Sequence, residues 1–378
     1  MIARASRRGT RTRRRLSALT AVVGALALTA SCSLTGGTGE SASDPADAER
    51  GDAASGSAAA GGGTVTLVTH DSFALPRKVI REFEEQSGYT LDQRPLGDAG
   101  SMTNQLVLAE GQPPGDVAYG VDNTFASRAL ENDVFAAYTP ADLPAGVADY
   151  ALPGDDAGVL TPVDEGSVCV NVDDTWFDER DQEPPTSLDD LTDPAYRDLF
   201  AVPGAATSST GLAFLLATIA EYGDDWPTYW TDLVDNGARI TAGWEQAYYS
   251  AFTQGGGNGE RPIVVSYDSS PAFTVADGGS TTSALLETCF RQVEYVGVLA
   301  GAENPTGAQA LVDFMLSPEV QEALPESMYV LPVVEGTPLP KDWATYAEQP
   351  TDPYTVDPAQ IAAERDDWLR EWTDVTSR

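Results

Sequence analysis

Histidine, cysteine and positive charge are scarce in this chain of 378 residues. It contains 1 His and 3 Cys, too few for a zinc site of the Cys/His type, and we expect no metal and no cofactor. Its 22 Lys and Arg face 58 Asp and Glu, which gives a net charge of -36. Nucleic acids and anionic bilayers are themselves negative, so this balance argues against binding either of them by charge. Such acidity favours a cationic small ligand, but it is also typical of a solvated surface that aids solubility.

The short motifs of several enzyme classes are missing as well. The sequence has no G-x-S-x-G, no G-x-x-x-x-G-K-[ST] and no G-x-G-x-x-G that opens a helix. We therefore expect a protein that is not an enzyme. One catalytic alternative stays open, namely a secreted hydrolase that uses His70 and Asp71.

An apolar run lies near the N-terminus. Residues 1–31 contain seven Arg and no acid, and the apolar stretch covers residues 16–30. A basic start, a short apolar centre and a small-residue exit describe a secretory signal peptide, and the run is too short to span a membrane comfortably. The segment 28–32 resembles a bacterial lipoprotein cleavage box, which implies that Cys32 becomes the first mature residue and carries a lipid. We expect an exported protein, anchored to the outer face of the cytoplasmic membrane through Cys32 alone.

A linker is expected to follow the lipid anchor. Residues 32–63 are rich in Gly, Ser, Ala, Asp and Glu and have almost no apolar side chains. This composition is typical of a flexible tether. A globular body held on such a tether outside the membrane suggests a receptor or a surface enzyme.

Strand and helix patterns alternate in the body of the chain. Residues 64–69 alternate as a β-branched strand, and further strands are expected at 90–94 and 116–120, with helices between them. This order argues for an α/β domain with a mostly parallel sheet. Ligands of such sheets bind at the carboxyl ends of the strands. Polar residues that directly follow these ends are His70, Asp71, Asp98 and Asp122.

Three later segments place polar and aromatic side chains at the ends of expected elements. Ser208 and Ser209 precede a strong helix, whose N-terminal N–H groups suit an anion or a hydroxyl, although plain N-capping explains these serines equally well. Trp244 follows a strand and is either a core residue or a stacking platform. Tyr267 and Phe273 follow another strand end, where aromatic faces beside carboxylates suit an organic cation.

The motifs of the body, taken together, resemble one family. They are Thr69-His70-Asp71-Ser72-Phe73, Gly97-Asp98, Gly120-Val121-Asp122-Asn123, Thr207-Ser208-Ser209-Thr210-Gly211-Leu212, Gly243-Trp244-Glu245-Gln246-Ala247-Tyr248, Ser266-Tyr267 with Ser270-Pro271-Ala272-Phe273, and Gln292-Val293-Glu294. With these residues the chain resembles the thiamine-binding proteins of bacterial ABC importers, which belong to the larger class of two-lobed solute-binding proteins. The resemblance extends over residues 64–378.

The resemblance implies a fold and a function. The fold is an α/β, type II periplasmic-binding-protein-like architecture of two lobes, each a sheet flanked by helices, with a hinge between them. The first lobe would cover residues 64–166 and the second 167–290, and residues 291–378 would return to the first lobe with a C-terminal helix across both. Such a protein would capture thiamine or its phosphate esters between the lobes, close by hinge motion, and deliver the ligand to the permease of an ABC importer as a monomer.

The resemblance also implies roles for single residues. Asp98 would pair with the cationic or amino-bearing part of thiamine, Trp244 would stack on or line its rings, and Ser208 and Ser209 would hold the hydroxyethyl or phosphate end. Tyr329 stands where the family has a stacking Trp. The full set of expected ligand-binding residues is His70, Asp71, Asp98, Asp122, Ser208, Ser209, Trp244, Tyr267, Phe273 and Tyr329.

Besides Tyr329, two residues differ from the side chains that the family carries at these positions. His70 and Phe273 stand at positions where the family has Tyr. The aromatic wall is kept at Phe273, whereas His70 is the change expected to alter affinity or its response to pH.

Other solutes remain open within the same fold. They are ferric iron, a polyamine or another phosphorylated metabolite. Iron-binding members of the class use adjacent tyrosines, and Tyr248-Tyr249 is such a pair, although it falls inside an expected helix.

A disulfide is expected between Cys169 and Cys289. Both residues fall in or beside expected strands whose segments would be neighbours near the hinge of this fold. Disulfides persist in exported proteins. Two unpaired buried thiols are the alternative.

Overall fold

The structure is a computed structural model that describes residues 62–377. The predicted signal peptide, the lipidation site Cys32 and nearly all of the predicted linker lie outside the described residues. Within residues 62–377, every helix is too short or too polar to cross a bilayer.

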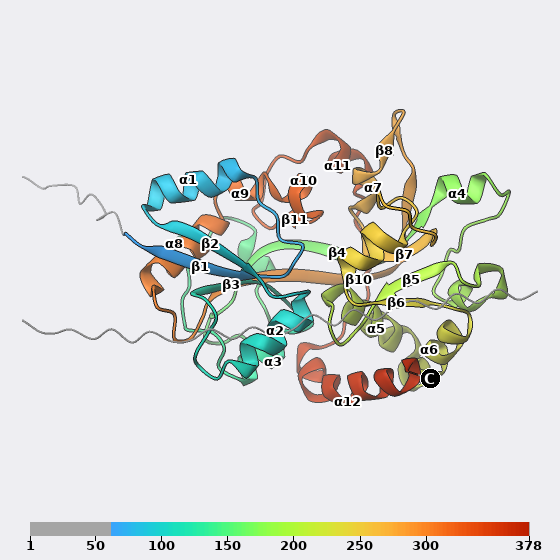
Figure 1. Ribbon diagram of the computed structural model, residues 1–378, viewed down its shortest axis with the longest axis horizontal. Coiled ribbons are helices and arrows are strands. Elements are labelled where there is room, and N and C mark those ends of the chain that lie inside the picture. Colours follow the sequence, from blue (N-terminus) through green and yellow to red (C-terminus); the bar gives the residue numbers. More distant parts are fainter. Residues whose placement is uncertain (1–61, 378) are drawn as a thin grey trace, which may run out of the picture. The chain divides into compact units, whose positions relative to one another are not determined.

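One mixed sheet of nine strands organises the body (Figure 1). Its order is β2-β1-β3-β10-β4-β7-β5-β6, and β11 pairs with β4 beside this path. Its strands are β1 (Thr64–Thr69), β2 (Thr90–Pro95), β3 (Val117–Asp122), β4 (Thr161–Asp173), β5 (Phe200–Pro203), β6 (Arg239–Thr241), β7 (Ile263–Tyr267), β10 (Thr282–Val298) and β11 (Leu331–Pro332). The short strands β8 (Val275–Ala276) and β9 (Gly279–Ser280) form a separate hairpin.

Two parallel groups of strands define the two lobes. In the first lobe β1 pairs in parallel with β2 and β3, and in the second lobe β5 pairs in parallel with β6 and β7. The mostly parallel sheet expected from the sequence is therefore correct within each lobe. It is wrong at the centre, where β10 runs antiparallel to both β3 and β4.

The long strands β4 and β10 pass from one lobe to the other. β4 is buried along its whole length, and it pairs with β10 over residues that reach from Thr161 to Asp173. Cys169 on β4 and Cys289 on β10 form the predicted disulfide. The predicted lobe boundaries at 166/167 and 290/291 fall inside these two strands, which makes the strands the connection between the lobes, while the boundary numbers themselves remain predictions.

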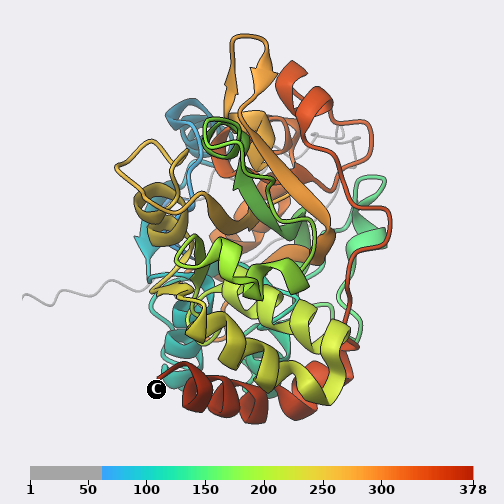
Figure 2. The same ribbon diagram turned by 90° about the vertical axis from the view of Figure 1, so that its right-hand side faces the viewer.

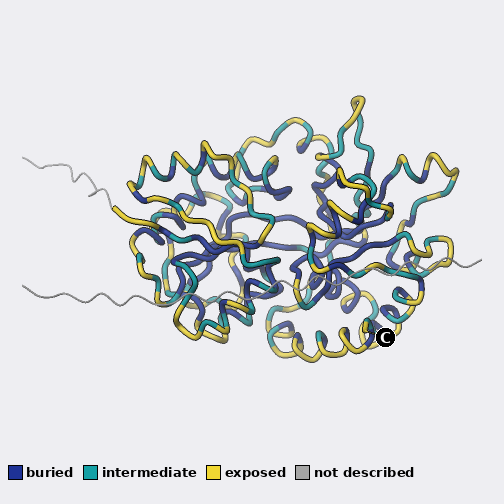
Figure 3. Tube along the Cα trace, viewed as in Figure 1, coloured by how far each residue is buried: buried dark blue, intermediate teal, exposed yellow. Residues whose placement is uncertain are grey.

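Helices cover both lobes and expose their outer faces, whereas the central strands are buried (Figure 3). The first lobe carries α1, α2, α3 and α8, and α5 and α6 pack on the second. The helices are α1 (Arg77–Ser87), α2 (Ala99–Leu108), α3 (Ala126–Glu131), α4 (Asp174–Asp178), α5 (Ser209–Tyr222), α6 (Trp226–Asp235), α7 (Ser270–Phe273), α8 (Pro305–Met315), α9 (Pro318–Gln321), α10 (Leu324–Met328), α11 (Lys341–Tyr346) and α12 (Pro358–Thr376). A π-helical segment, η5 (Gln246–Ala251), follows Trp244. The single 3₁₀ turns are η1 (Val147–Tyr150), η2 (Asp189–Thr192), η3 (Pro194–Tyr196) and η4 (Gly223–Asp225).

The C-terminal helix α12 contacts helices of both lobes. It packs against α3 of the first lobe and α6 of the second, and both views show it beneath α6 (Figures 1 and 2). Asp357 caps it by accepting the Ala359 N–H, and Pro358 occupies its first turn. The Trp372 indole packs edge-on against Trp230 of α6, with 5.5 Å between ring centroids.

Candidate functional site

Three predicted site residues meet at one edge of the first lobe. His70 directly follows β1, Asp98 follows β2 and starts α2, and Asp122 is the last residue of β3. Because β1, β2 and β3 are parallel, their carboxyl ends share this edge. The expected clustering of polar residues at strand ends is confirmed for this lobe.

Asp98 reaches from this edge to the second lobe. Its Oδ2 accepts the Trp244 N–H at 2.8 Å, and its Oδ1 accepts the Ser209 N–H at 3.3 Å and the Ala99 N–H at 2.7 Å. Burial raises the pKa of Asp98, and the N–H of Trp244 opposes this rise by stabilising the ionised form. The carboxylate therefore joins the lobes and caps α2, two tasks that the sequence did not indicate.

Ser209 forms a second connection between the lobes. Its hydroxyl donates to Asp122 Oδ2, and it accepts the side-chain N–H of Gln292 at 3.0 Å. Burial raises the pKa of Asp122 to about 7. Ser208 precedes α5, but its side chain makes no capping bond and lies 3.1 Å from the Thr210 hydroxyl. Side-chain capping, one of the two explanations for these serines, is thus wrong for Ser208.

The aromatic residues predicted for the site form one cluster. Trp244 stacks on Tyr248 with an interplanar angle of 15°, and it packs against Tyr267 and Tyr329 at centroid distances of 6.0 and 5.7 Å. Its indole N–H donates to the Ser266 hydroxyl at 3.0 Å. The ring centroids of Phe273 and Tyr329 lie 4.4 Å apart, and Phe273 is 48% exposed. Trp244 is only 5% exposed, so it is a core residue of the second lobe.

A cavity of about 500 Å³ lies beside this cluster, between the two lobes. Asp71 and Asp98 line it from the first lobe, and Glu245 and Tyr249 line it from the second. Burial raises the pKa of Glu245, and the negative charges of Asp71 and Asp98 add to the rise. None of its lining residues is basic, so the cavity suits a positively charged solute.

His70 is buried between ionisable groups. Its Nε2 lies 3.5 Å from Glu294 Oε1, and its Nδ1 lies 3.0 Å from the Ser72 hydroxyl. The ring nitrogens face these two groups, so the pairing of His70 with Asp71 that the hydrolase alternative needs is not formed. Asp71 is instead exposed at the cavity.

Of the ten predicted site residues, Asp71 and Asp98 line the cavity, whereas the other eight lie outside its lining and all of these except Phe273 are buried. Two further residues contact members of this set. Gln292 and Glu294 are buried on β10 and contact Ser209 and His70. A signal for both existed in the sequence, because polar side chains two residues apart inside an apolar strand point to one buried face.

The tyrosine pair of the iron alternative does not present two open side chains. Tyr248 is fully buried, whereas Tyr249 lines the cavity. Among residues 62–377, moreover, no three His, Cys, Asp or Glu side chains are grouped so that they could hold a metal ion.

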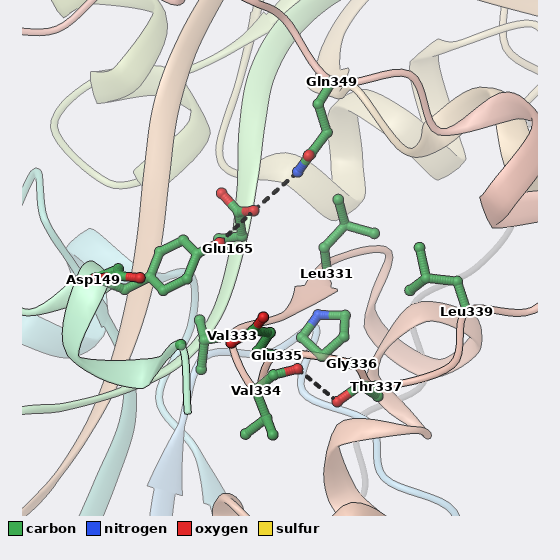
Figure 4. Close-up of a pocket in the computed structure, with 13 residues that line it drawn as sticks. Asp149, Glu165, Leu331, Val333, Val334, Glu335, Gly336, Thr337, Leu339 and Gln349 are labelled. Atoms are coloured by element: carbon green, nitrogen blue, oxygen red, sulfur yellow. Dashed lines mark hydrogen bonds between the residues drawn. The ribbon is translucent and has the colours of Figure 1, made fainter. Parts of the chain in front are cut away.

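A second cavity, of about 310 Å³, lies around Glu165 and the segment 331–339 (Figure 4). Glu165 Oε1 accepts the Tyr150 hydroxyl at 3.0 Å and the Gln349 side-chain N–H at 2.9 Å, while Oε2 lies 3.3 Å from Arg291 Nη1. Through these contacts Glu165 ties β4 to the neighbouring segments.

Two lobes joined by shared strands, with a lined cavity between them, define a solute-binding protein. Residues 112–350 match the family model described as bacterial extracellular solute-binding protein, and the chain belongs to this family. The thiamine-binding periplasmic protein of Escherichia coli is 32% identical over 83% of this chain and 94% of its own length. The protein of the same name from Brucella suis is 30% identical over 83% of this chain and 92% of its own length.

Solved structures agree with this assignment. A periplasmic thiamin binding protein superimposes with a TM-score of 0.73 and 29% identity, covering 83% of this chain and 96% of its own. Iron-bound HitA from Pseudomonas aeruginosa, at 22% identity, covers 82% of this chain and 99% of its own with a TM-score of 0.65, and this likeness concerns the fold alone.

Proposed function

We propose that this protein captures thiamine or a thiamine phosphate between its lobes and delivers it to the permease of an ABC importer. The observation that carries the proposal is the acidic cavity of about 500 Å³ between the lobes, with an aromatic cluster beside it. Thiamine has a permanently charged thiazolium ring and a second flat ring. Carboxylates compensate such a charge and aromatic faces stack on such rings, while the names of the relatives point to the same ligand.

The proposal gives each predicted residue a place. Asp71 and Asp98 face the cationic part, because they line the cavity. The two rings of thiamine stack against the aromatic cluster of Trp244, Tyr267, Phe273 and Tyr329. Ser208 and Ser209, at the start of α5, hold the hydroxyethyl or phosphate end.

Ser209 and Asp122 would have to exchange partners for this role. The Ser209 hydroxyl donates to Asp122 in the present structure, so a bound hydroxyl or phosphate competes with this bond. The charges of Asp98 and Glu294 both act on His70.

The remaining parts of the proposal concern location and assembly. We place the body outside the cytoplasmic membrane on the linker of residues 32–63, with lipidated Cys32 as its anchor. The protein acts as a monomer that binds and releases an unchanged solute, so no catalytic step is assigned to His70 or Asp71.

Calorimetric titration tests the ligand. We expect a single site for thiamine, thiamine monophosphate or thiamine diphosphate on the full-length chain, with tryptophan fluorescence quenched on binding because Trp244 packs against Tyr249, which lines the cavity. A titration of all three compounds side by side ranks them. Absence of heat with all three, together with binding of ferric iron or a polyamine, would reject the proposal in favour of another solute.

A further inference from the structure

A row of four buried polar side chains runs from the cavity side of β1 into the connection between the lobes. His70 Nε2 lies 3.5 Å from Glu294 Oε1, Tyr119 lies 2.9 Å from Glu294 Oε2, and Tyr119 lies 2.5 Å from Asp164 Oδ2. All four residues are at most 6% exposed. They come from β1, β3, β4 and β10, and the proposed function gives no task to Tyr119, Asp164 or Glu294.

The contacts of Tyr119 fix the position of one proton in this row. A phenol has a single O–H and can donate to only one carboxylate, yet Tyr119 lies within hydrogen-bond distance of two. Both distances are accounted for when one of these carboxyl groups carries a proton and donates it to the phenol oxygen. Burial and the neighbouring Glu294 raise the pKa of Asp164 well above its usual range, which makes Asp164 the protonated acid and Glu294 the acceptor.

Glu294 is then an ionised group in the interior of the protein. Burial alone would raise the pKa of Glu294, but His70 and the Tyr119 hydroxyl outweigh burial and lower it. A buried carboxylate of this kind requires a positive partner. His70 is the group within ion-pair distance.

The surroundings of His70 favour its charged form. Gly120 leaves room for the ring, since a Cβ atom there would lie 2.1 Å from His70 Cδ2. Burial alone would lower the pKa of His70, yet Glu294, Asp98 and Asp71 together raise it. Glu245 is the other charged group that faces the ring across the cavity.

We infer that Glu294 holds His70 as an imidazolium cation beside the cavity, and that a cationic solute bound next to Asp98 drives off this proton. The first half of the inference, the charged state of His70, rests on the buried row alone. The second half, the release of the proton by a bound cation, rests on the proposed function. It makes Glu294 a positioning residue that acts through His70.

The coupling follows from a shared carboxylate. Asp98 attracts both the proton on His70 and the proposed solute. A bound cation satisfies Asp98 and repels the imidazolium, so the proton is released and the affinity for the cation rises with pH. With one proton linked, the rise is at most about tenfold per pH unit below the titration midpoint of His70.

The single histidine of the chain permits a direct test. In full-length protein without a histidine tag, the imidazole signals in an NMR titration belong to His70 alone. We expect a midpoint above the ordinary value of 6.5 and a fall of at least about one pH unit in Glu294→Gln. The control Glu287→Gln makes the same change at an exposed position of β10 and should leave the midpoint unchanged.

A third variant tests the assignment of the proton to Asp164. Asp164→Asn replaces the protonated acid by a neutral amide that still donates to Tyr119, so the His70 midpoint should stay within about 0.3 units of the wild type. A wild-type midpoint at or below 6.5, or equal midpoints in Glu294→Gln and Glu287→Gln, overturns the first half of the inference.

Calorimetry of the wild type alone decides the second half, even if Glu294→Gln does not fold. Titration of thiamine in phosphate and in Tris at the His70 midpoint should give different heats, because released protons react with buffers of different ionisation enthalpy. Binding with equal heats in both buffers overturns the coupling and leaves the proposed function intact. Lack of binding in either buffer rejects the proposed function, and the NMR result still stands by itself.

Discussion

Asp98 is the residue at which capping, lobe contact and proposed ligand binding coincide. Asn at this position keeps the size of the side chain but loses its charge. Its NH₂ group would then face the backbone N–H of either Trp244 or Ser209, a donor that now donates to Asp98. We expect Asp98→Asn to weaken binding of thiamine more than about tenfold, or about 1.4 kcal/mol, in calorimetric titration. The control Asp92→Asn makes the same change at an exposed position of β2. Wild-type affinity in Asp98→Asn would remove this residue from the site.

Single residues of the site were predicted in part, and the reason lies in what a sequence pattern records. His70, Asp98 and Asp122 follow strand ends, and parallel pairing brings these ends together, so they were found. The spacing of Gln292 and Glu294 indicates a shared buried face, but it does not identify the partner of Glu294, which lies more than two hundred residues away at His70. The bond between Asp98 and Trp244 depends on how the lobes meet, and no spacing along the chain encodes it.

The elements were predictable where local signals were strong. α12 begins at the Asp357 cap with Pro358 in its first turn, and α1 ends at Gly88 in the left-handed conformation, both of which are helix-boundary signals that the sequence carries. The sequence pattern predicts a strand only at residues 292–299, whereas β10 begins at Thr282 because its N-terminal half pairs with β4 across the connection between the lobes. The π-helical form of η5 was not foreseen, since its i→i+5 bonding leaves no periodic signal of its own.

The start of α2 lies against the segment between β6 and η5, and Gly243 is part of that contact. A Cβ atom on Gly243 would lie 2.7 Å from Asp98 Oδ2, and the N–H groups that Asp98 accepts hold its carboxylate in place. We expect Gly243→Ala to keep the lobes from closing and to weaken thiamine binding at least about tenfold. The midpoint of urea unfolding should stay close to that of the wild type, because the clash lies between the lobes.

A matched control exists for this substitution. Gly279→Ala adds the same methyl group on β9, where it would meet no atom within 4 Å, and it should leave both affinity and stability unchanged. Tight binding by Gly243→Ala would show that the contact between Asp98 and this segment is dispensable for closure.

At the scale of the whole molecule, β4 and β10 serve both lobes, and the disulfide between Cys169 and Cys289 fastens these two strands to each other. Motion of the lobes is then confined to bending around shared strands, which is the hinge closure of two-lobed binding proteins. The same connection buries carboxylates: Asp122, Asp164, Asp268 and Glu294 are all less than 5% exposed. The architecture that permits closure therefore also concentrates carboxyl groups in the interior, where burial favours their protonated form.

These buried carboxyl groups predict how the stability of the protein depends on pH. Burial raises the pKa of Asp122 and of Asp268 to about 7 in the folded protein, against about 3.9 in an unfolded chain. A raised carboxyl pKa means that the folded state holds the proton more tightly, so the stabilisation is complete below pH 4 and is lost as pH rises through 7. The free energy of unfolding, measured with urea at pH 5, 6, 7 and 8 in 0.5 M salt to screen the surface charges, should therefore fall by about 1 kcal/mol per pH unit or more.

Asp268→Asn separates this effect from the general acidity of the protein. Both Asp268 side-chain oxygens are buried without a hydrogen-bond partner, and an Asn there stays neutral at every pH, so the variant should lose up to about one proton's share of the slope, roughly 1.4 kcal/mol per pH unit. The control Asp374→Asn removes the same charge from the exposed face of α12 and should keep the wild-type slope. A wild-type profile that stays flat or rises between pH 5 and 8 would mean that the buried carboxylates are ionised without cost, and equal slopes in the two variants would locate the effect away from Asp268.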